Sequence, residues 1–202
     1  MIFIVLRFVV FGLCFFIFYC LRKNSVCFSH RRDALRAFVL ATVITTFLTL
    51  VPIENAFATF SSPENAFRYS NFGTIQQVVA GQKADFVIAK NGEKSIYAIF
   101  PKTDKGWKLS RWLDLELTTS VITEETTVSV YRYKNTEDYY VTVFGNNGGV
   151  LSVSDSRNSE FVSLACANAA LNQTFYTYYA YASALDNYYV LTVNNKPIQL
   201  WS

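Results

Sequence analysis

The feature that most constrains the fold of this chain is the contrast between residues 1–58 and residues 59–202. Residues 1–58 carry six basic and two acidic side chains, whereas residues 59–202 carry 12 basic and 13 acidic side chains. The first part contains ten Phe and one Tyr, and the second contains eight Phe and twelve Tyr. Phe suits an apolar interior, whereas Tyr suits a partly wet surface that buries its ring and solvates its hydroxyl. We therefore divide the chain into an N-terminal hydrophobic targeting region and a second domain, residues 59–202.

The N-terminal region contains two apolar runs separated by a basic stretch. The first run covers residues 1–21, the basic stretch covers 22–36, and the second run lies in residues 37–58, where Pro52 closes it. A membrane-spanning helix takes about 20 apolar residues, and shorter runs are typical of signal-peptide cores or buried helices. The sequence predicts either a transmembrane hairpin with its basic loop in the cytoplasm or a late secretory signal. A translation start later than Met1 would also explain the first run.

The second run has the layout of a secretory signal peptide. Basic residues precede it, and Ala56 and Ala58 place small side chains at the two positions that signal peptidase reads before Thr59. Cleavage after Ala58 would secrete residues 59–202, and an uncleaved chain would keep them tethered to the cell membrane. Both interpretations place this domain outside the cytoplasm.

Short runs of β-branched and aromatic residues alternate with turn residues from Phe72 onward. Strands are predicted over 74–80, 85–89, 95–100, 113–121, 126–133, 139–144, 150–153, 161–166, 174–181, 188–193 and 198–201. Asn91-Gly92 and Asn194-Asn195 supply the positive φ angles that tight hairpins need. The sequence therefore predicts an all-β fold, an antiparallel sandwich or barrel-like domain of repeated hairpins.

One repeated pattern and one ambiguous stretch bear on the topology. Segments that begin at Asp85, Asp138 and Asn187 each place a β run before an Asn- or Gly-rich turn, at spacings of 53 and 49 residues. Hairpins of one sandwich explain this pattern better than propeller blades, because three units do not close a ring. The Ala-rich stretch 161–172 fits a helix as well, but we favour a strand because the Tyr-rich run that follows needs a partner.

The residue types in residues 59–202 exclude several kinds of chemistry. The only histidine of the chain is His30, and Cys166 is the only cysteine of this domain, so Ser–His–Asp and Cys–His catalysis and zinc sites are excluded. The nearly neutral charge argues against nucleic acid as a partner. Carboxylate pairs such as Asp114 and Glu116 remain available for hydrolysis. We expect a non-catalytic domain with no cofactor and no metal.

Two groups of residues are candidate ligand-binding sites. In the first, a basic residue recurs every three positions after Pro101, which fits an extended, polyproline-like segment with its cations along one side. This basic segment comprises Lys102, Lys105, Trp107, Lys108, Arg111 and Trp112. Cations beside indole rings suit an anionic polymer such as teichoic acid, a lipid headgroup or a glycan. The alternative is a solvated loop whose Trp side chains are buried.

The second group is a cluster of tyrosines, Tyr176, Tyr178, Tyr179 and Tyr181. Strand alternation places two of these rings on each face, so we expect one pair in the core and one pair available to solvent or to a partner. Cross-strand aromatic pairing is the alternative.

These observations predict a non-catalytic β domain that binds a component of the bacterial cell envelope: an anionic polymer, a glycan or a protein. A binding domain of this kind would lose its sedimentation with cell-wall sacculi when Trp107 and Trp112 become Ala. The alternative is a structural or assembly subunit of a membrane complex that works through a transmembrane hairpin in residues 1–58. A carboxylate-based hydrolase comes third.

Overall fold

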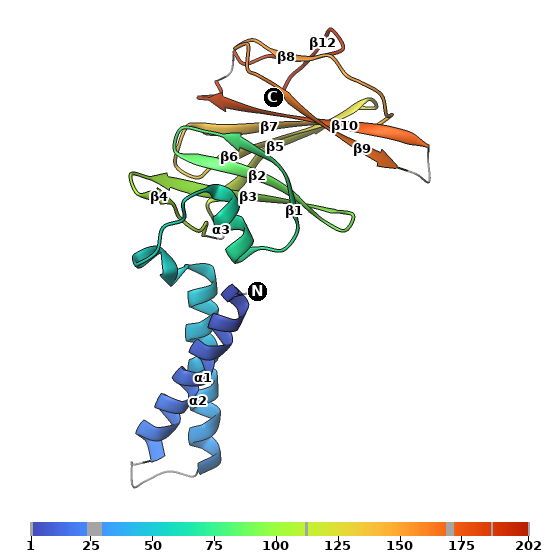
Figure 1. Ribbon diagram of the computed structural model, residues 1–202. Coiled ribbons are helices and arrows are strands. Elements are labelled where there is room, and N and C mark those ends of the chain that lie inside the picture. The colour runs from blue at the N-terminus through green and yellow to red at the C-terminus, as the bar shows by residue number, and fades with distance from the viewer. Residues whose placement is uncertain (1, 24–29, 112, 169–171, 187, 202) are drawn as a thin grey trace.

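The structure, a computed structural model, describes most of the chain. The described residues are 2–23, 30–111, 113–168, 172–186 and 188–201. Within them, mostly antiparallel β structure follows helices at the N-terminal side (Figure 1). The helical elements are α1 (Ile2–Lys23), α2 (His30–Leu50), the 3-10 turn η1 (Ile53–Ala56) and α3 (Pro63–Ser70). The predicted β character is confirmed for most of residues 59–202.

Helices α1 and α2 form an antiparallel hairpin that extends away from the sheets (Figure 1). Ala37 and Ala41 are buried, and Phe11 packs edge-on against Phe38 with ring centroids 5.7 Å apart. Small residues allow the two backbones to approach, while many large apolar side chains stay on the outside. Those that are at least 60% exposed are Phe8, Phe16, Leu35, Val43 and Phe47.

No helix in the described part of the chain is long and apolar enough to cross a membrane. This finding does not support the membrane-spanning alternative for residues 1–21 and 37–58. In α2, the charged Arg32 and Arg36 belong to the helix itself and the helix ends at Leu50, which shortens its uncharged stretch. The secretory-signal interpretation stays a prediction.

The strand pattern does not predict α3, although its N-terminus is encoded locally. Ser62 adopts an extended conformation and its Oγ accepts a hydrogen bond from the backbone N–H of Asn65 at 3.2 Å. Pro63 occupies the first turn, where its missing N–H leaves no intrahelical bond unmade. Ala66 and Phe67 are fully buried against the neighbouring sheet. Cap and apolar face together define a helix of two turns.

Three antiparallel sheets make up the β structure of the described residues. The first sheet has the order β1 (Thr74–Ala80), β2 (Ala84–Asn91), β3 (Lys94–Thr103), β4 (Gly106–Trp107). The second has the order β5 (Leu115–Ile122), β6 (Thr126–Tyr133), β7 (Asp138–Gly145), β10 (Gln173–Ser183), β9 (Val162–Asn168). The third has the order β12 (Lys196–Ile198), β11 (Leu191–Val193), β8 (Val153–Asp155).

Helix α3 and the three sheets are stacked in layers, with a buried apolar cluster at each interface (Figure 1). Helix α3 covers the outer face of the first sheet, where Phe67 meets Phe100. The inner face of the first sheet packs on the second sheet through Phe86 and Tyr140. The other face of the second sheet packs on the third sheet around Val141 and Leu191. Both large sheets are therefore covered on two faces.

The predicted hairpins are confirmed at two places and corrected at a third. Gly92 joins β2 to β3 with φ of 61°, and Asn194 and Asn195 join β11 to β12 with φ of 50° and 62°. The middle unit of the supposed repeat is not a hairpin, because β7 pairs with β6 and β10 while β8 pairs with β11. The chain leaves the second sheet after Gly145 to build the third. The Ala-rich stretch forms β9, as the strand interpretation predicts.

Candidate functional site

The first and second sheets are tied together at one end, which we call the closed end. Here Phe86 stacks on Tyr97, Tyr131 and Tyr140, with ring centroids 5.6, 5.6 and 4.9 Å away. Aromatic rings in such offset contacts add to the free energy of their burial. The ring of Phe86 is fully buried, so this stack fills the space between the sheets.

A buried carboxylate holds the closed end by hydrogen bonds. Asp138, 2% exposed, accepts from the backbone N–H groups of Lys83 at 2.6 Å and Ala84 at 3.1 Å. Its second oxygen accepts from the hydroxyl of Tyr181 at 3.0 Å, and the hydroxyl of Tyr140 donates to the carbonyl of Ala84 at 2.8 Å. These bonds join β7 and β10 of the second sheet to the turn before β2 of the first. A buried carboxylate with several donors stabilises such a junction.

The protonation state of the closed end is fixed by burial. Desolvation raises the pKa of Tyr140 far above its ordinary value, and the nearby charge of Asp138 raises it further. The pKa of Tyr181 is raised to about 12, first by burial and then by its hydrogen bond to Asp138. Both phenols therefore remain protonated donors at neutral pH.

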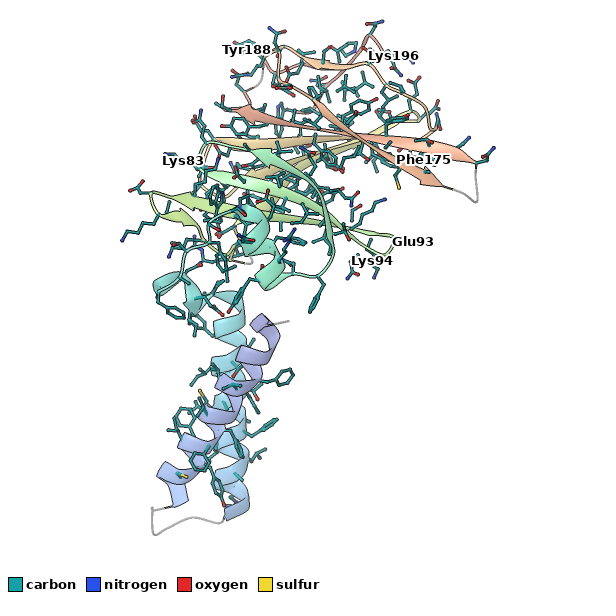
Figure 2. The ribbon with its side chains drawn as sticks, viewed as in Figure 1. Lys83, Glu93, Lys94, Phe175, Tyr188 and Lys196 are labelled. Carbon is teal, nitrogen blue, oxygen red and sulfur yellow. The ribbon has the colours of Figure 1, made fainter. Side chains whose placement is uncertain are left out.

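At the opposite end the two sheets diverge and leave a cleft of about 390 Å³. Figure 2 shows Lys83 near the closed end, Glu93 and Lys94 at the far tip of the first sheet, and Phe175 on the second sheet at the same open end. The volume lies in the range of small-molecule sites in proteins. The cleft is lined by residues of β1, β2 and β3 on one side and of β6, β7, β9 and β10 on the other.

A row of hydroxyl groups crosses the second sheet inside this cleft. Ser129, Thr142 and Tyr179 occupy directly opposing positions on β6, β7 and β10 and line the cleft together. The hydroxyl of Thr142 donates to the carbonyl of Ser129 at 3.1 Å, and Ser129 shares a hydrogen bond with Ser120 at 3.2 Å. Each hydroxyl oxygen has two lone pairs and therefore keeps capacity to accept a further bond.

Tyrosine rings form the inner wall of the cleft. Tyr97 and Tyr131 are partly buried, and their ring centroids lie 5.4 Å apart. Burial raises the pKa of Tyr131, and it raises the pKa of Tyr179 further. The hydroxyls of Tyr131 and Tyr179 are therefore neutral at physiological pH and can both donate and accept hydrogen bonds.

A polar side-chain contact also bridges the two sides of the cleft. The ammonium of Lys90 on β2 donates to the sulfur of Cys166 on β9 at 2.6 Å. Both side chains are partly buried, and both line the cleft. Within the described residues, no three or more His, Cys, Asp or Glu side chains are grouped in a way that would hold a metal.

The basic segment forms a hairpin rather than the extended conformation that its period of three suggests. Lys102 on β3 lies opposite Trp107 on β4, because the chain reverses between them. Lys102 pairs with Asp85 at 2.7 Å, and the indole N–H of Trp107 donates to the same carboxylate at 2.7 Å. The reversal separates the cations, so they do not line one side. Lys105 lies exposed in the turn of this hairpin.

The remaining members of the basic segment contact neighbouring parts of the chain. The Lys108 ammonium donates to the carbonyls of Asn55 at 2.6 Å and Ala58 at 2.7 Å. Arg111 pairs with the buried Asp114 at 3.1 Å, and Trp112 lies outside the described residues. Ligand binding by this segment stays a prediction, and the structure gives Lys102, Lys108 and Arg111 intramolecular partners.

The tyrosine cluster alternates as predicted, and each of its two faces packs against a neighbouring sheet. Tyr178 packs toward the third sheet with Tyr176 beside it, and Tyr179 packs toward the first sheet with Tyr181 beside it. The expectation of one free face is corrected, because β10 lies in the middle layer of the stack. Of the four, Tyr179 reaches the cleft.

The residues around the predicted cleavage site contact the segment that follows β4. Ala56 ends η1, the Ala58 carbonyl accepts from Lys108, and Thr59 is exposed. The side chain of Asn55 makes two hydrogen bonds of 2.8 Å with the backbone of Leu109. Cleavage after Ala58 stays a prediction.

The carboxylate pair Asp114 and Glu116 is engaged in local contacts. Asp114 also accepts from the backbone N–H of Arg111, and Glu116 pairs with Arg132 at 2.8 Å. This ion pair lowers the pKa of Glu116. Asp114 is buried and Glu116 is exposed, so the two do not face each other across the cleft.

Sequence reasoning missed the cleft residues Lys90, Tyr97, Ser129 and Thr142. A signal for one of them was present in residues 126–133, where Val128 and Val130 alternate with hydroxyl-bearing side chains. This pattern indicates a strand with one apolar and one hydroxylated face. It does not reveal which strands lie opposite, so the row across three strands was not visible.

Comparisons with protein-family models, with curated proteins and with solved structures find no match to this chain.

Proposed function

We propose that the cleft between the first and second sheets binds a carbohydrate chain of the bacterial cell envelope. The observation that carries this proposal is the hydroxyl row of Ser129, Thr142 and Tyr179, which faces a cleft walled by Tyr97 and Tyr131. Sugars present hydroxyls around apolar ring faces. Hydroxyl side chains pair with the former, and aromatic rings pack against the latter.

The charge of the cleft favours binding over hydrolysis. Among the described residues that line it, Glu93 is the single carboxylate, and it is exposed at the tip of the β2–β3 turn. Glycoside hydrolysis ordinarily uses two carboxyl groups that flank the scissile bond. We therefore propose a non-catalytic role that retains a polymer rather than cutting it.

The test is co-sedimentation of the full chain with purified bacterial cell-wall sacculi. Thr142→Val removes one hydroxyl of the row and keeps the shape of the side chain, so we expect affinity to fall about tenfold. Tyr188→Ala is the matched control, because Tyr188 is 87% exposed and lies outside the cleft. Equal sedimentation of Thr142→Val and wild type, or a loss confined to Tyr188→Ala, would contradict the proposal.

A second candidate function is assembly through the α1–α2 hairpin. Its support is the exposure of the large apolar side chains Phe8, Phe16 and Phe47, since extensive exposed apolar surface marks contacts with other molecules. We propose an apolar protein surface as the partner. A photo-crosslinking residue placed at Phe16 should give a discrete protein adduct in cells, and the same residue at Tyr188 should give none. Adducts with lipid alone at Phe16 would contradict assembly with a protein.

A further inference from the structure

We infer that the carbohydrate taken by the cleft is acidic, and that its carboxylate or phosphate group binds the ammonium of Lys90. This inference rests on the proposed function and adds the chemical class of the ligand. It is carried by the position of Lys90, by its partner and by the charges around it.

Lys90 is placed to reach a ligand that lies between the sheets. It lies near the end of β2, opposite Thr74 on β1 and Ser95 on β3, and on the same face as Ile88. Its ammonium crosses the cleft to the sulfur of Cys166. A ligand held between the sheets at this end therefore lies within reach of this group.

The partner of Lys90 is a poor match for its charge. A thiol is a weak hydrogen-bond acceptor, whereas an ammonium forms its strongest bonds with anionic oxygen. Partial burial removes water from the cation, and the sulfur returns little of the lost solvation. A carboxylate or phosphate in the cleft would replace the sulfur of Cys166 with a charged acceptor and strengthen the bond.

Other lysines of the chain form ion pairs with carboxylates. Lys102 lies 2.7 Å from Asp85, and Lys196 lies 2.5 Å from Glu125. No carboxylate of the described residues lies within ion-pair distance of Lys90, whose charge is thus available to a ligand. Glu93 lies in the exposed turn and lines the cleft, whereas Lys94 begins β3 and lies outside the cleft lining.

The experiment compares acidic and neutral ligands on the full chain by isothermal titration calorimetry. The probes are an oligogalacturonate, the neutral oligogalactose of the same linkage and length, and an oligomer of glycerol phosphate. We expect one or both acidic probes to bind at least tenfold more tightly than the neutral sugar, with a preference that weakens as salt is added. Carboxylate and phosphodiester sources are distinguished by which acidic probe binds more tightly.

Three variants assign the preference to Lys90. Lys90→Met keeps the alkyl chain and removes the charge, so the preference for acidic probes should vanish while neutral binding persists. Lys90→Arg should keep the preference. Lys94→Met, at the start of β3 and outside the cleft lining, should leave it unchanged.

Equal binding of acidic and neutral probes by the wild type, or an acidic preference that survives Lys90→Met, overturns the inference and leaves the proposed function standing. Absence of binding by all three probes overturns both. The wild-type comparison does not depend on how well any variant folds.

Discussion

The closed end and the cleft are built from the same strands, and β7 runs from the closed end to the cleft. Alternate residues on one face are Asp138, Tyr140, Thr142 and Phe144. The first two are buried and bonded to the first sheet, the third belongs to the hydroxyl row, and Phe144 is 40% exposed at the mouth. On β2 the same passage runs from Phe86 to Lys90.

Whether a side chain is buried in the core or lines the cleft therefore depends on where the two sheets diverge, and not on residue type alone. Tyr140 and Tyr131 are directly opposite neighbours on β7 and β6. Tyr140 is 1% exposed and donates to a backbone carbonyl, whereas Tyr131 borders the cleft. Stability is concentrated where the sheets meet, which leaves the polar groups at the other end available for a ligand.

The largest expected effect is on the central ring of the closed end. Phe86→Ala should lower the free energy of unfolding by about 3–5 kcal/mol, because it leaves a cavity between the stacked rings. Phe144→Ala, at the mouth of the cleft, should lower it by about 1 kcal/mol or less. Urea denaturation followed by circular dichroism measures both. Similar losses for the two variants would remove the difference between the ends.

The buried carboxylate ranks next. Asp138→Ala leaves two backbone N–H groups and the hydroxyl of Tyr181 without their acceptor, so we expect a loss of about 3 kcal/mol. The neighbouring Glu137 is exposed, and Glu137→Ala should change stability little. The same denaturation experiment applies. If Asp138→Ala lowered the free energy of unfolding as little as Glu137→Ala, the closed end would not depend on the hydrogen bonds of Asp138.

A change inside the cleft should affect stability less. Thr142→Val removes one hydrogen bond to the carbonyl of Ser129, which contributes about 1 kcal/mol. The variant should nevertheless lose about tenfold in affinity for sacculi, as proposed above. Thermal unfolding measured beside co-sedimentation separates the two effects. If the variant lost much stability and its binding fell in proportion, Thr142 would stabilise the core rather than contact the ligand.

The smallest expected effect is a pH dependence at the closed end. The pKa of Tyr181 is about 12 in the folded chain, while an unfolded tyrosine titrates near pH 10. Between these values a folded Tyr181 is protonated and an unfolded one is not, so the contribution of Tyr181 to stability is constant near neutral pH up to about pH 10 and is lost as pH rises to about 12. Tyr181→Phe should make this fall shallower. An unchanged pH profile for the variant would mean that other groups cause it.

Strand positions were largely predictable from the sequence, because alternation and turn residues are local. Thr74–Ala80 and Thr126–Tyr133 have the bounds that their β-branched runs predict. The order of the strands was not predictable, since β7 pairs with β10 past two intervening strands, of which β8 joins the third sheet and β9 forms the edge of the second. Long-range pairing of this kind leaves no trace in the spacing of apolar residues.

The candidate site was harder to predict than the strands. Lys102 and Trp107 stood out in the sequence because of their unusual pattern, yet both bind Asp85 and support the first sheet. Nothing in the sequence around Lys90 and Thr142 marks them as site residues. Their place in the cleft depends on which strands lie opposite, and that is set by the fold. Asp138 resembles a solvated turn residue until its burial between two sheets is known.

The most direct test of the central claim is hydrogen–deuterium exchange of the full chain, with and without soluble glycan fragments released from bacterial sacculi. The account predicts slower exchange in the strands that line the cleft, around Lys90 on β2 and along Val162–Asn168, with no change at Lys83 and Ala84 of the closed end. Protection centred on the hairpin of Lys102 and Trp107, with the cleft strands unchanged, would contradict it.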